Sequence, residues 1–205
     1  METQETGIEN FDERESLRVI TEMIAVSRKK LRHDGILFIV WGWALFYSSF
    51  SGYLKEEILF SNLQYRLFQY MEYFLMIFVF GFTLWYLFRK DRKTSTYIGL
   101  SLRWVWFSAF FCMVLINLIQ ANVVHKINFE LQHPIFMVVI AFAVVVSGVI
   151  LRYGFMIGMG ILFGLLAYAG SFFELHTQML AESVAWFFGF ILPGHILFAR
   201  KTKEA

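Results

Sequence analysis

The chain has 205 residues, of which 58% are hydrophobic, 20% aromatic and 17% charged. Soluble domains are about 45–50% apolar and about 25% charged, so this composition excludes a water-soluble single domain. With 25 phenylalanines and two prolines it also excludes a disordered or collagen-like chain, and the single cysteine excludes an internal disulfide. The net charge of +2 does not indicate nucleic acid as a partner, because the basic residues cluster at the ends of apolar stretches.

The amino-terminal tail, residues 1–34, contains a helical pattern between Asp12 and His33. Four of its apolar residues fall near one face at helical spacing: Leu17, Ile20, Ile24 and Leu31. The first turns are acidic and the last is basic, which matches the helix dipole and brings cations toward anionic lipid headgroups. The pattern predicts a cytoplasmic amphipathic helix. We interpret it as a helix on the membrane surface, with docking to a protein partner or to a second copy of the chain as the alternative.

The intervals between charged residues locate the membrane spans, because a helix needs about 20 apolar residues to cross the hydrocarbon core. Tyr73–Phe88 and Ser183–Ala199 have only 16 and 17 residues, so we expect both helices to begin earlier in the chain. Leu131–Phe173 is too long for one crossing, and we expect a hairpin near Arg152 with Gly154 as the turn residue. The prediction is an all-α membrane bundle of six transmembrane helices over residues 35–199, followed by a cytoplasmic tail, 200–205. The spans are at about 35–54, 69–88, 104–124, 134–151, 154–173 and 180–199.

The basic residues give the orientation of this bundle. Six spans place both termini on one side, and 15 of the 18 Lys and Arg residues then fall on that side. The other side has only Lys55, Arg66 and Lys126. Short loops rich in Lys and Arg stay in the cytoplasm. The sequence therefore predicts a multi-pass protein with both termini in the cytoplasm, and five spans would scatter the basic clusters over both faces.

Polar residues within the apolar spans are the candidate functional residues, because a polar group in lipid is costly. Glu72 and Glu182 lie at the outer ends of short spans, where placement at the membrane interface is the plainer interpretation. Asn117 and Gln120 lie in the outer half of the third span and would form hydrogen bonds to neighbouring helices. His195 follows a Pro-Gly pair in the last span. A bend there could place His195 in a substrate or proton path, or more plainly at the cytoplasmic rim.

Small residues form a stripe on the fifth predicted span: Gly160, Gly164, Ala167 and Ser171. Such a stripe allows two helix backbones to approach closely. Packing within one molecule is the plainer interpretation and homodimerisation the alternative.

Histidines and glutamates gather on the outer face, where they are of the right chemical type for a divalent metal or a proton relay. These residues are His125, His133, His176, Glu130, Glu174 and Glu182. Their spacing fits no short chelating motif. We therefore predict neither a metal site nor a cofactor.

Several catalytic motifs are missing from the sequence. It has no His-Glu-x-x-His, Gly-x-Ser-x-Gly or phosphate-loop motif, and Cys112 has no second cysteine with which to form a redox pair. We therefore predict a non-enzymatic integral membrane protein that is an accessory, scaffold or regulatory subunit of a membrane complex. The alternative is a small transporter or a transporter's substrate-binding subunit. A water-filled cavity at mid-membrane would favour the transporter, and dry apolar packing there would disfavour it.

Three short motifs resemble those of a group of small multi-pass bacterial membrane proteins. They are Glu15-Ser16-Leu17, Trp41-Gly42-Trp43 and Leu192-Pro193-Gly194-His195. The resemblance implies a six-span protein of the bacterial inner membrane without an assigned activity.

The predicted size, span count and cytoplasmic termini are also similar to those of substrate-binding subunits of energy-coupling-factor vitamin transporters. That family typically carries an Ala-x-x-x-Ala surface on its first span, on which the coupling subunit docks. The first span here has Gly42 and Ala44, followed by the bulky Phe46 and Tyr47. The resemblance therefore fails at the docking motif.

Overall fold

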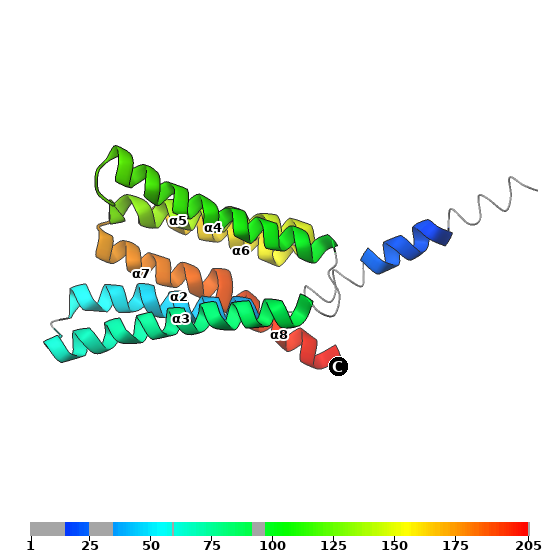
Figure 1. The fold of residues 1–205 in the computed structure, drawn as a ribbon, viewed down its shortest axis with the longest axis horizontal. Helices are drawn as coiled ribbons and strands as arrows, with labels where there is room; N and C mark the ends of the chain where they lie inside the picture. The colour runs from blue at the N-terminus through cyan, green and yellow to red at the C-terminus, as the bar shows by residue number, and fades with distance from the viewer. Residues whose placement is uncertain (1–14, 25–34, 59, 92–96, 205) are drawn as a thin grey trace, which may run out of the picture.

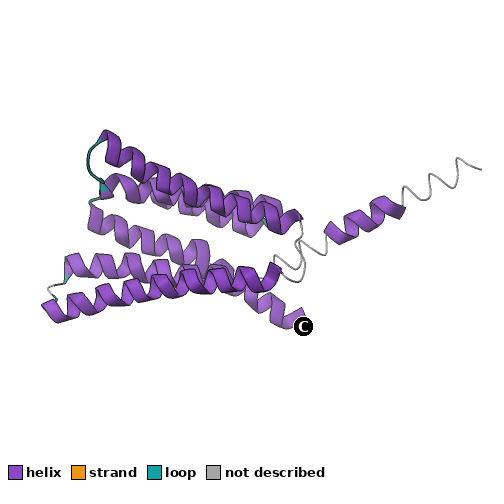
Figure 2. Cartoon of the chain, in the orientation of Figure 1, coloured by secondary structure: helices purple, strands orange, loops and turns teal. Residues whose placement is uncertain are grey.

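The computed structural model describes residues 15–24, 35–58, 60–91 and 97–204. All of the regular secondary structure in these ranges is helical, and no strand is present among them (Figure 2). Residues 15–24 form a helix that lies apart from the rest in Figure 1, near the end of the bundle where the chain terminates. The remaining helices form one elongated bundle.

The bundle is built from seven α-helices within the described ranges, and its elements in chain order are α2 (Ile36–Glu57), α3 (Asn62–Asp91), α4 (Tyr97–Val123), α5 (Phe129–Leu151), α6 (Gly154–Gly170), α7 (Leu175–Trp186), η1 (Phe187–Ile191) and α8 (Leu192–Glu204). The element η1 is a π-helical turn that connects α7 to α8.

Five helical stretches of the described chain are long and apolar enough to cross a membrane. They are α2, α4, α5, residues Asn62–Tyr86 of α3, and Leu175–Ala199, which runs through α7, η1 and α8. The helix α6 is also apolar but has only 17 residues. The fold is therefore that of a helical membrane protein with several spans, as the composition predicts.

Helix α7 lies at the centre of the arrangement (Figure 1). It contacts α2 on one side and α5 and α6 on the other. Among the described residues, α3 has its main contacts with α2, and α4 has its main contacts with α5. The bundle therefore consists of an α2–α3 pair and an α4–α5–α6 group, with α7 between them.

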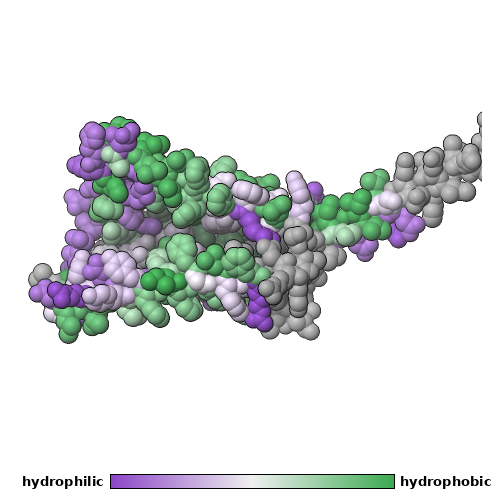
Figure 3. Space-filling view, in the orientation of Figure 1, coloured by the Kyte–Doolittle hydropathy of each residue, from purple (hydrophilic) through white to green (hydrophobic). Residues whose placement is uncertain are grey.

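The outer helices leave large apolar side chains uncovered. Phe74 and Ile77 on α3 and Phe107 on α4 are each more than half exposed. Figure 3 shows hydrophobic side chains along the flank of the bundle and hydrophilic side chains toward its two ends. An apolar flank of this extent suits lipid rather than water as the surrounding solvent.

Two helices begin before the short apolar intervals Tyr73–Phe88 and Ser183–Ala199, as the lengths of these intervals predict. The helix α3 begins at Asn62, ahead of Glu72, and α7 begins at Leu175, ahead of Glu182. The last span begins five residues before the predicted residue 180, and Glu182 lies inside the helix, where its carboxylate has two hydrogen-bond partners. A paired charge need not mark the end of a span.

The hairpin between α5 and α6 occurs at the predicted place, but its turn residue differs from the prediction. Arg152 ends α5 in the left-handed conformation, with φ of 51°, and its N–H donates to the carbonyls of Gly148 and Val149. The prediction of Gly154 as the turn residue is wrong, because Gly154 begins α6 and has no positive φ. The glycine that this hairpin requires is Gly148, where a Cβ would lie 2.9 Å from the Ile157 backbone nitrogen.

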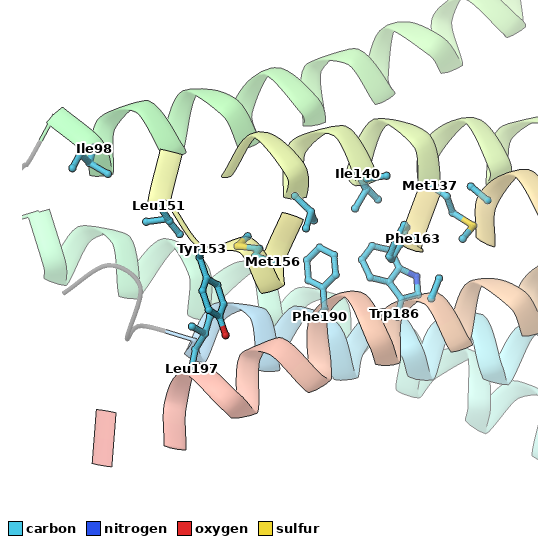
Figure 4. Close-up of a cluster of buried hydrophobic side chains, with 14 residues drawn as sticks. Ile98, Met137, Ile140, Leu151, Tyr153, Met156, Phe163, Trp186, Phe190 and Leu197 are labelled. Carbon is cyan, nitrogen blue, oxygen red and sulfur yellow. The ribbon is translucent and has the colours of Figure 1, made fainter. Parts of the chain in front are cut away.

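The core of the bundle is an aromatic cluster at its centre (Figure 4). Phe163 of α6, Trp186 of α7 and Phe190 of η1 are each at most 4% exposed. Their ring centroids are 4.8–6.0 Å apart in edge-to-face geometry. Met137 and Ile140 of α5 belong to the same buried cluster. Large apolar side chains therefore fill the middle of the bundle.

Two glycines bring α2 into near-backbone contact with η1 and α8. A Cβ on Gly42 would lie 3.0 Å from the backbone nitrogen of Ile191, and a Cβ on Gly194 would lie 2.9 Å from that of Ile39. Helices in membranes associate through such close approaches, since burial away from water does not drive them together there. Gly42 and Gly194 belong to the Trp-Gly-Trp and Leu-Pro-Gly-His motifs, so these motifs have a packing role.

Candidate functional site

Among the described residues, two pairs of largely buried ionisable side chains lie within the bundle, in the half remote from the carboxyl terminus. One pair joins α2 to α3 and the other joins α5 to α7. Each contains one of the two glutamates that the sequence singles out. Charged groups at this depth are expensive unless they are paired, so these two pairs are the candidate site residues.

The first pair is Lys55 and Glu72. The Lys55 ammonium lies 2.8 Å from Glu72 Oε1, and the two side chains are 11% and 19% exposed. The Ser51 hydroxyl donates to the same carboxylate oxygen. The ammonium also lies 5.7 Å from the centroid of the Tyr65 ring. Glu72 therefore joins α2 to α3 through paired polar contacts, at the end of the bundle remote from the carboxyl terminus.

The second pair is His133 and Glu182. His133 Nδ1 lies 2.6 Å from Glu182 Oε2, and the side chains are 24% and 13% exposed. The second carboxylate oxygen, Oε1, accepts a hydrogen bond of 3.1 Å from Trp186 Nε1. Both oxygens of Glu182 therefore have partners, one on α5 and one on its own helix.

The pairing of His133 with Glu182 is not evident from the sequence. The two residues are 49 positions apart, and no spacing rule connects them. One feature could have suggested the pairing. His133 and Glu182 each lie within about two turns of the start of their helices, α5 and α7, so the two side chains are at a similar level along the bundle. His133 is therefore a candidate residue that the sequence groups with the outer loop histidines and the structure places inside the bundle.

Of the two amide residues that the sequence singles out on α4, Gln120 bonds to the loop that follows the helix. Gln120 is buried, and its Oε1 accepts a hydrogen bond of 2.9 Å from the Asn128 backbone N–H. Asn128 in turn caps α5 by accepting from the Leu131 N–H. The Oδ1 of Asn117 is buried without a hydrogen-bond partner among the described residues. Gln120 therefore fixes the connection from α4 to α5, in keeping with a packing role.

His195 bonds to the backbone of its own helix. Its Nδ1 lies 2.9 Å from the carbonyl oxygen of Ile191, to which the ring N–H donates. The preceding turn is π-helical, with the Leu192 N–H bonded to the carbonyl of Phe187. Pro193 contributes to this irregularity because it has no N–H to donate. The side chain is exposed on the surface of the bundle, which disfavours a substrate or proton path through the interior at this residue.

The small-residue stripe lies against α5 of the same molecule over most of its length. A Cβ on Gly160 would lie 3.0 Å from the Val145 backbone nitrogen, and one on Gly164 would lie 3.4 Å from Ala141 Cβ. Ala167 is 1% exposed. Ser171 follows the end of α6 and donates to the Tyr168 carbonyl. This geometry favours packing within the molecule over homodimerisation.

The apolar residues of the amino-terminal helix are uncovered. Leu17 is 63% exposed, Ile20 is 53% and Ile24 is 41%. Leu31, the fourth residue of the predicted stripe, lies outside the described residues. The three described residues lie on one side of the helix and leave an apolar surface that a membrane or a protein partner could cover.

The two pairs described above provide groups for charge pairing and for proton exchange. In the described ranges, no three His, Cys, Asp or Glu side chains come together as a metal ion would require. Comparisons with protein-family models, with curated proteins and with solved structures found no match to the chain. The resemblance to small six-span bacterial proteins therefore stays a prediction.

Proposed function

We propose that the protein is a non-enzymatic integral membrane protein that acts as an accessory, scaffold or regulatory subunit of a membrane complex. The observation that carries this proposal is the filled centre of the bundle. Phe163, Trp186 and Phe190 pack on one another at the level where a transport path would have to cross. The ionisable side chains of the two pairs are bonded to each other across neighbouring helices, so each pair joins two helices.

The proposed topology has six spans in a bacterial inner membrane, with both termini in the cytoplasm. The helix α6 would be the fifth crossing. Its 17 residues give a length of about 25 Å, a few ångströms less than the hydrocarbon core. Local thinning of the bilayer can accommodate a difference of this size. The distribution of basic residues supports the orientation.

Cysteine labelling tests whether α6 crosses the membrane. The experiment begins from a Cys112→Ser background and places single cysteines at Gly154 and Phe172, at opposite ends of α6. A Cβ at Gly154 meets nothing within 4 Å, and Phe172 is 71% exposed, so both substitutions are sterically mild. We expect a membrane-impermeant maleimide to label position 172 from outside and position 154 only after permeabilisation. Labelling of both from one side would refute the six-span topology.

The interaction surface of this proposed subunit is the amino-terminal helix, through Leu17, Ile20 and Ile24. Crosslinking in native membranes followed by purification tests it. If the helix holds a protein partner, Leu17→Asp with Ile24→Asp should abolish recovery of the crosslinked neighbour. A matched control is Arg18→Asp, which changes the charge by the same amount on another side of the helix. Equal recovery with the double variant and with this control would rule out this helix as a protein-binding surface and leave the bilayer as its partner.

A small transporter, or a transporter's substrate-binding subunit, is the second candidate. The two charge pairs within the spans favour it, because intramembrane ionisable residues often mark substrate or proton pathways. Cysteine accessibility separates the two candidates. Ala143 on α5 is fully buried, so Ala143→Cys in the Cys112→Ser background should resist a water-soluble maleimide if the centre is dry. Rapid labelling at position 143, with the protein still folded, would favour the transporter and overturn the scaffold proposal.

A further inference from the structure

We propose that His133, Glu182 and Trp186 form a proton-sensitive link between α5 and α7, which tightens when the adjoining side of the membrane becomes acidic. The proposal rests on the geometry of three side chains. His133 Nδ1 is 2.6 Å from Glu182 Oε2, and Trp186 Nε1 is 3.1 Å from Glu182 Oε1. It does not depend on the scaffold function, since the same link would operate in a transporter.

The chemistry of the link is the uptake of one proton by the imidazole. When the ring is neutral, its Nδ1–H donates to the carboxylate and the pair has a net charge of −1. When Nε2 takes a proton from water, the ring becomes an imidazolium and the net charge of the pair becomes zero. An uncompensated charge is costly in a low-dielectric interior, and a charge-assisted hydrogen bond is stronger than a neutral one. Protonation therefore strengthens the contact between α5 and α7.

The other charged groups on the helices around His133 and Glu182 are exposed or are paired with each other. On α2, on α5 and at the start of α7, the exposed charged residues are Glu56, Glu57, Glu130 and Glu174, and His176 is partly exposed. His176 lies 3.7 Å from Glu174, and Lys55 of α2 is bonded to Glu72. The helix α6 has no charged residue between Gly154 and Gly170. The helix α4, which packs on α5, has none between Trp104 and Val123, and His125 and Lys126 of the loop between α4 and α5 are exposed. The carboxylate of Glu182 is therefore the group in direct contact with the His133 ring.

The position of Trp186 connects the link to the core. Trp186 is 2% exposed, and its ring lies 5.0 Å from that of Phe163 and 4.8 Å from that of Phe190. Because its indole N–H donates to Glu182, a change in the charge of the pair acts on a side chain at the centre of the bundle. The proton state at one end can thereby affect the packing of α7 against α5 and α6.

Thermal unfolding in detergent, at values between about pH 5 and pH 8, tests the proposal. For the wild type we expect a Tm that is about 2–4 °C higher at the acidic end. His133→Gln should lose this difference. In Glu182→Gln, protonation creates an unpaired cation, so the acidic gain should disappear or change sign. His125→Gln, at an exposed position, and His176→Gln, at a partly exposed one, serve as controls and should retain the wild-type difference.

A second measurement keeps the proposal testable if His133→Gln does not fold. Glu182→Gln keeps an amide oxygen that can accept from Trp186, so it preserves the shape of the site. We expect the wild-type tryptophan fluorescence to change with pH, and this change to be absent in Glu182→Gln and in Trp186→Phe. A wild-type Tm that does not rise on acidification, or an acidic gain that persists in Glu182→Gln, would overturn the proposal.

Discussion

Replacement of Gly42 by alanine tests the close packing of α2 on the last membrane-spanning stretch. The new Cβ would lie 2.9 Å from Ile191 Cγ1 and 3.0 Å from the Ile191 backbone nitrogen. Real Cβ atoms seldom come so close to a neighbour, so one of the two helices must shift. Overpacking of this kind costs about 1–3 kcal/mol. Alanine also stabilises a helix by about 1 kcal/mol relative to glycine, and this contribution opposes the steric cost.

A matched control removes the helix-propensity contribution from this prediction. Gly81 of α3 lies within a helix, and a Cβ there would meet nothing within 4 Å. Gly81→Ala therefore has the propensity gain without the clash. The difference between the two variants should equal the steric cost, about 1–3 kcal/mol, which corresponds to a Tm that is about 3–9 °C lower for Gly42→Ala. Thermal unfolding in detergent measures it. A Gly42→Ala variant as stable as Gly81→Ala would refute the inferred contact.

Two further substitutions test the polar contacts between α2 and α3 by the same unfolding assay. Lys55→Met should lower the stability by about 3 kcal/mol, because it leaves the Glu72 carboxylate without its ammonium partner. The double variant Lys55→Met with Glu72→Met should recover most of that loss, and a double variant no better than the single would contradict the pairing. Trp41→Phe removes the 2.9 Å hydrogen bond from Trp41 Nε1 to Thr83 Oγ1 and should cost about 0.6–1 kcal/mol. No loss of stability would show that this bond contributes nothing.

The helical class and the approximate helix positions follow from the sequence because lipid imposes a simple rule on charge. A crossing helix cannot accommodate many unpaired charges, so the intervals between charged residues approximate the spans. The rule gives the wrong boundary where a charge is paired. Glu182 lies well inside the last span because His133 and Trp186 bond to its carboxylate. That pairing depends on which helices become neighbours, and a single sequence does not contain this information.

The sequence predicts several individual residues of the candidate site, but it does not predict which residues contact one another. The cost of polar groups in lipid singles out Glu72, Glu182 and Gln120 from the sequence. Their partners, Lys55, His133 and the Asn128 backbone, are set by the tertiary arrangement. Turn chemistry shows the same limit, since glycine is the usual choice for a turn but Arg152 adopts the left-handed conformation of the α5–α6 hairpin.

The central position of α7 has a consequence for biogenesis. The α2–α3 pair and the α4–α5–α6 group share few direct contacts in the described chain, and α7 touches both. Since α7 leaves the ribosome after all of these helices, the two parts would remain loosely associated during synthesis and lock together only when the last hydrophobic segment enters the bilayer. A nascent chain stalled before Leu175 should therefore be open to quality-control proteases, whereas the finished protein should resist them.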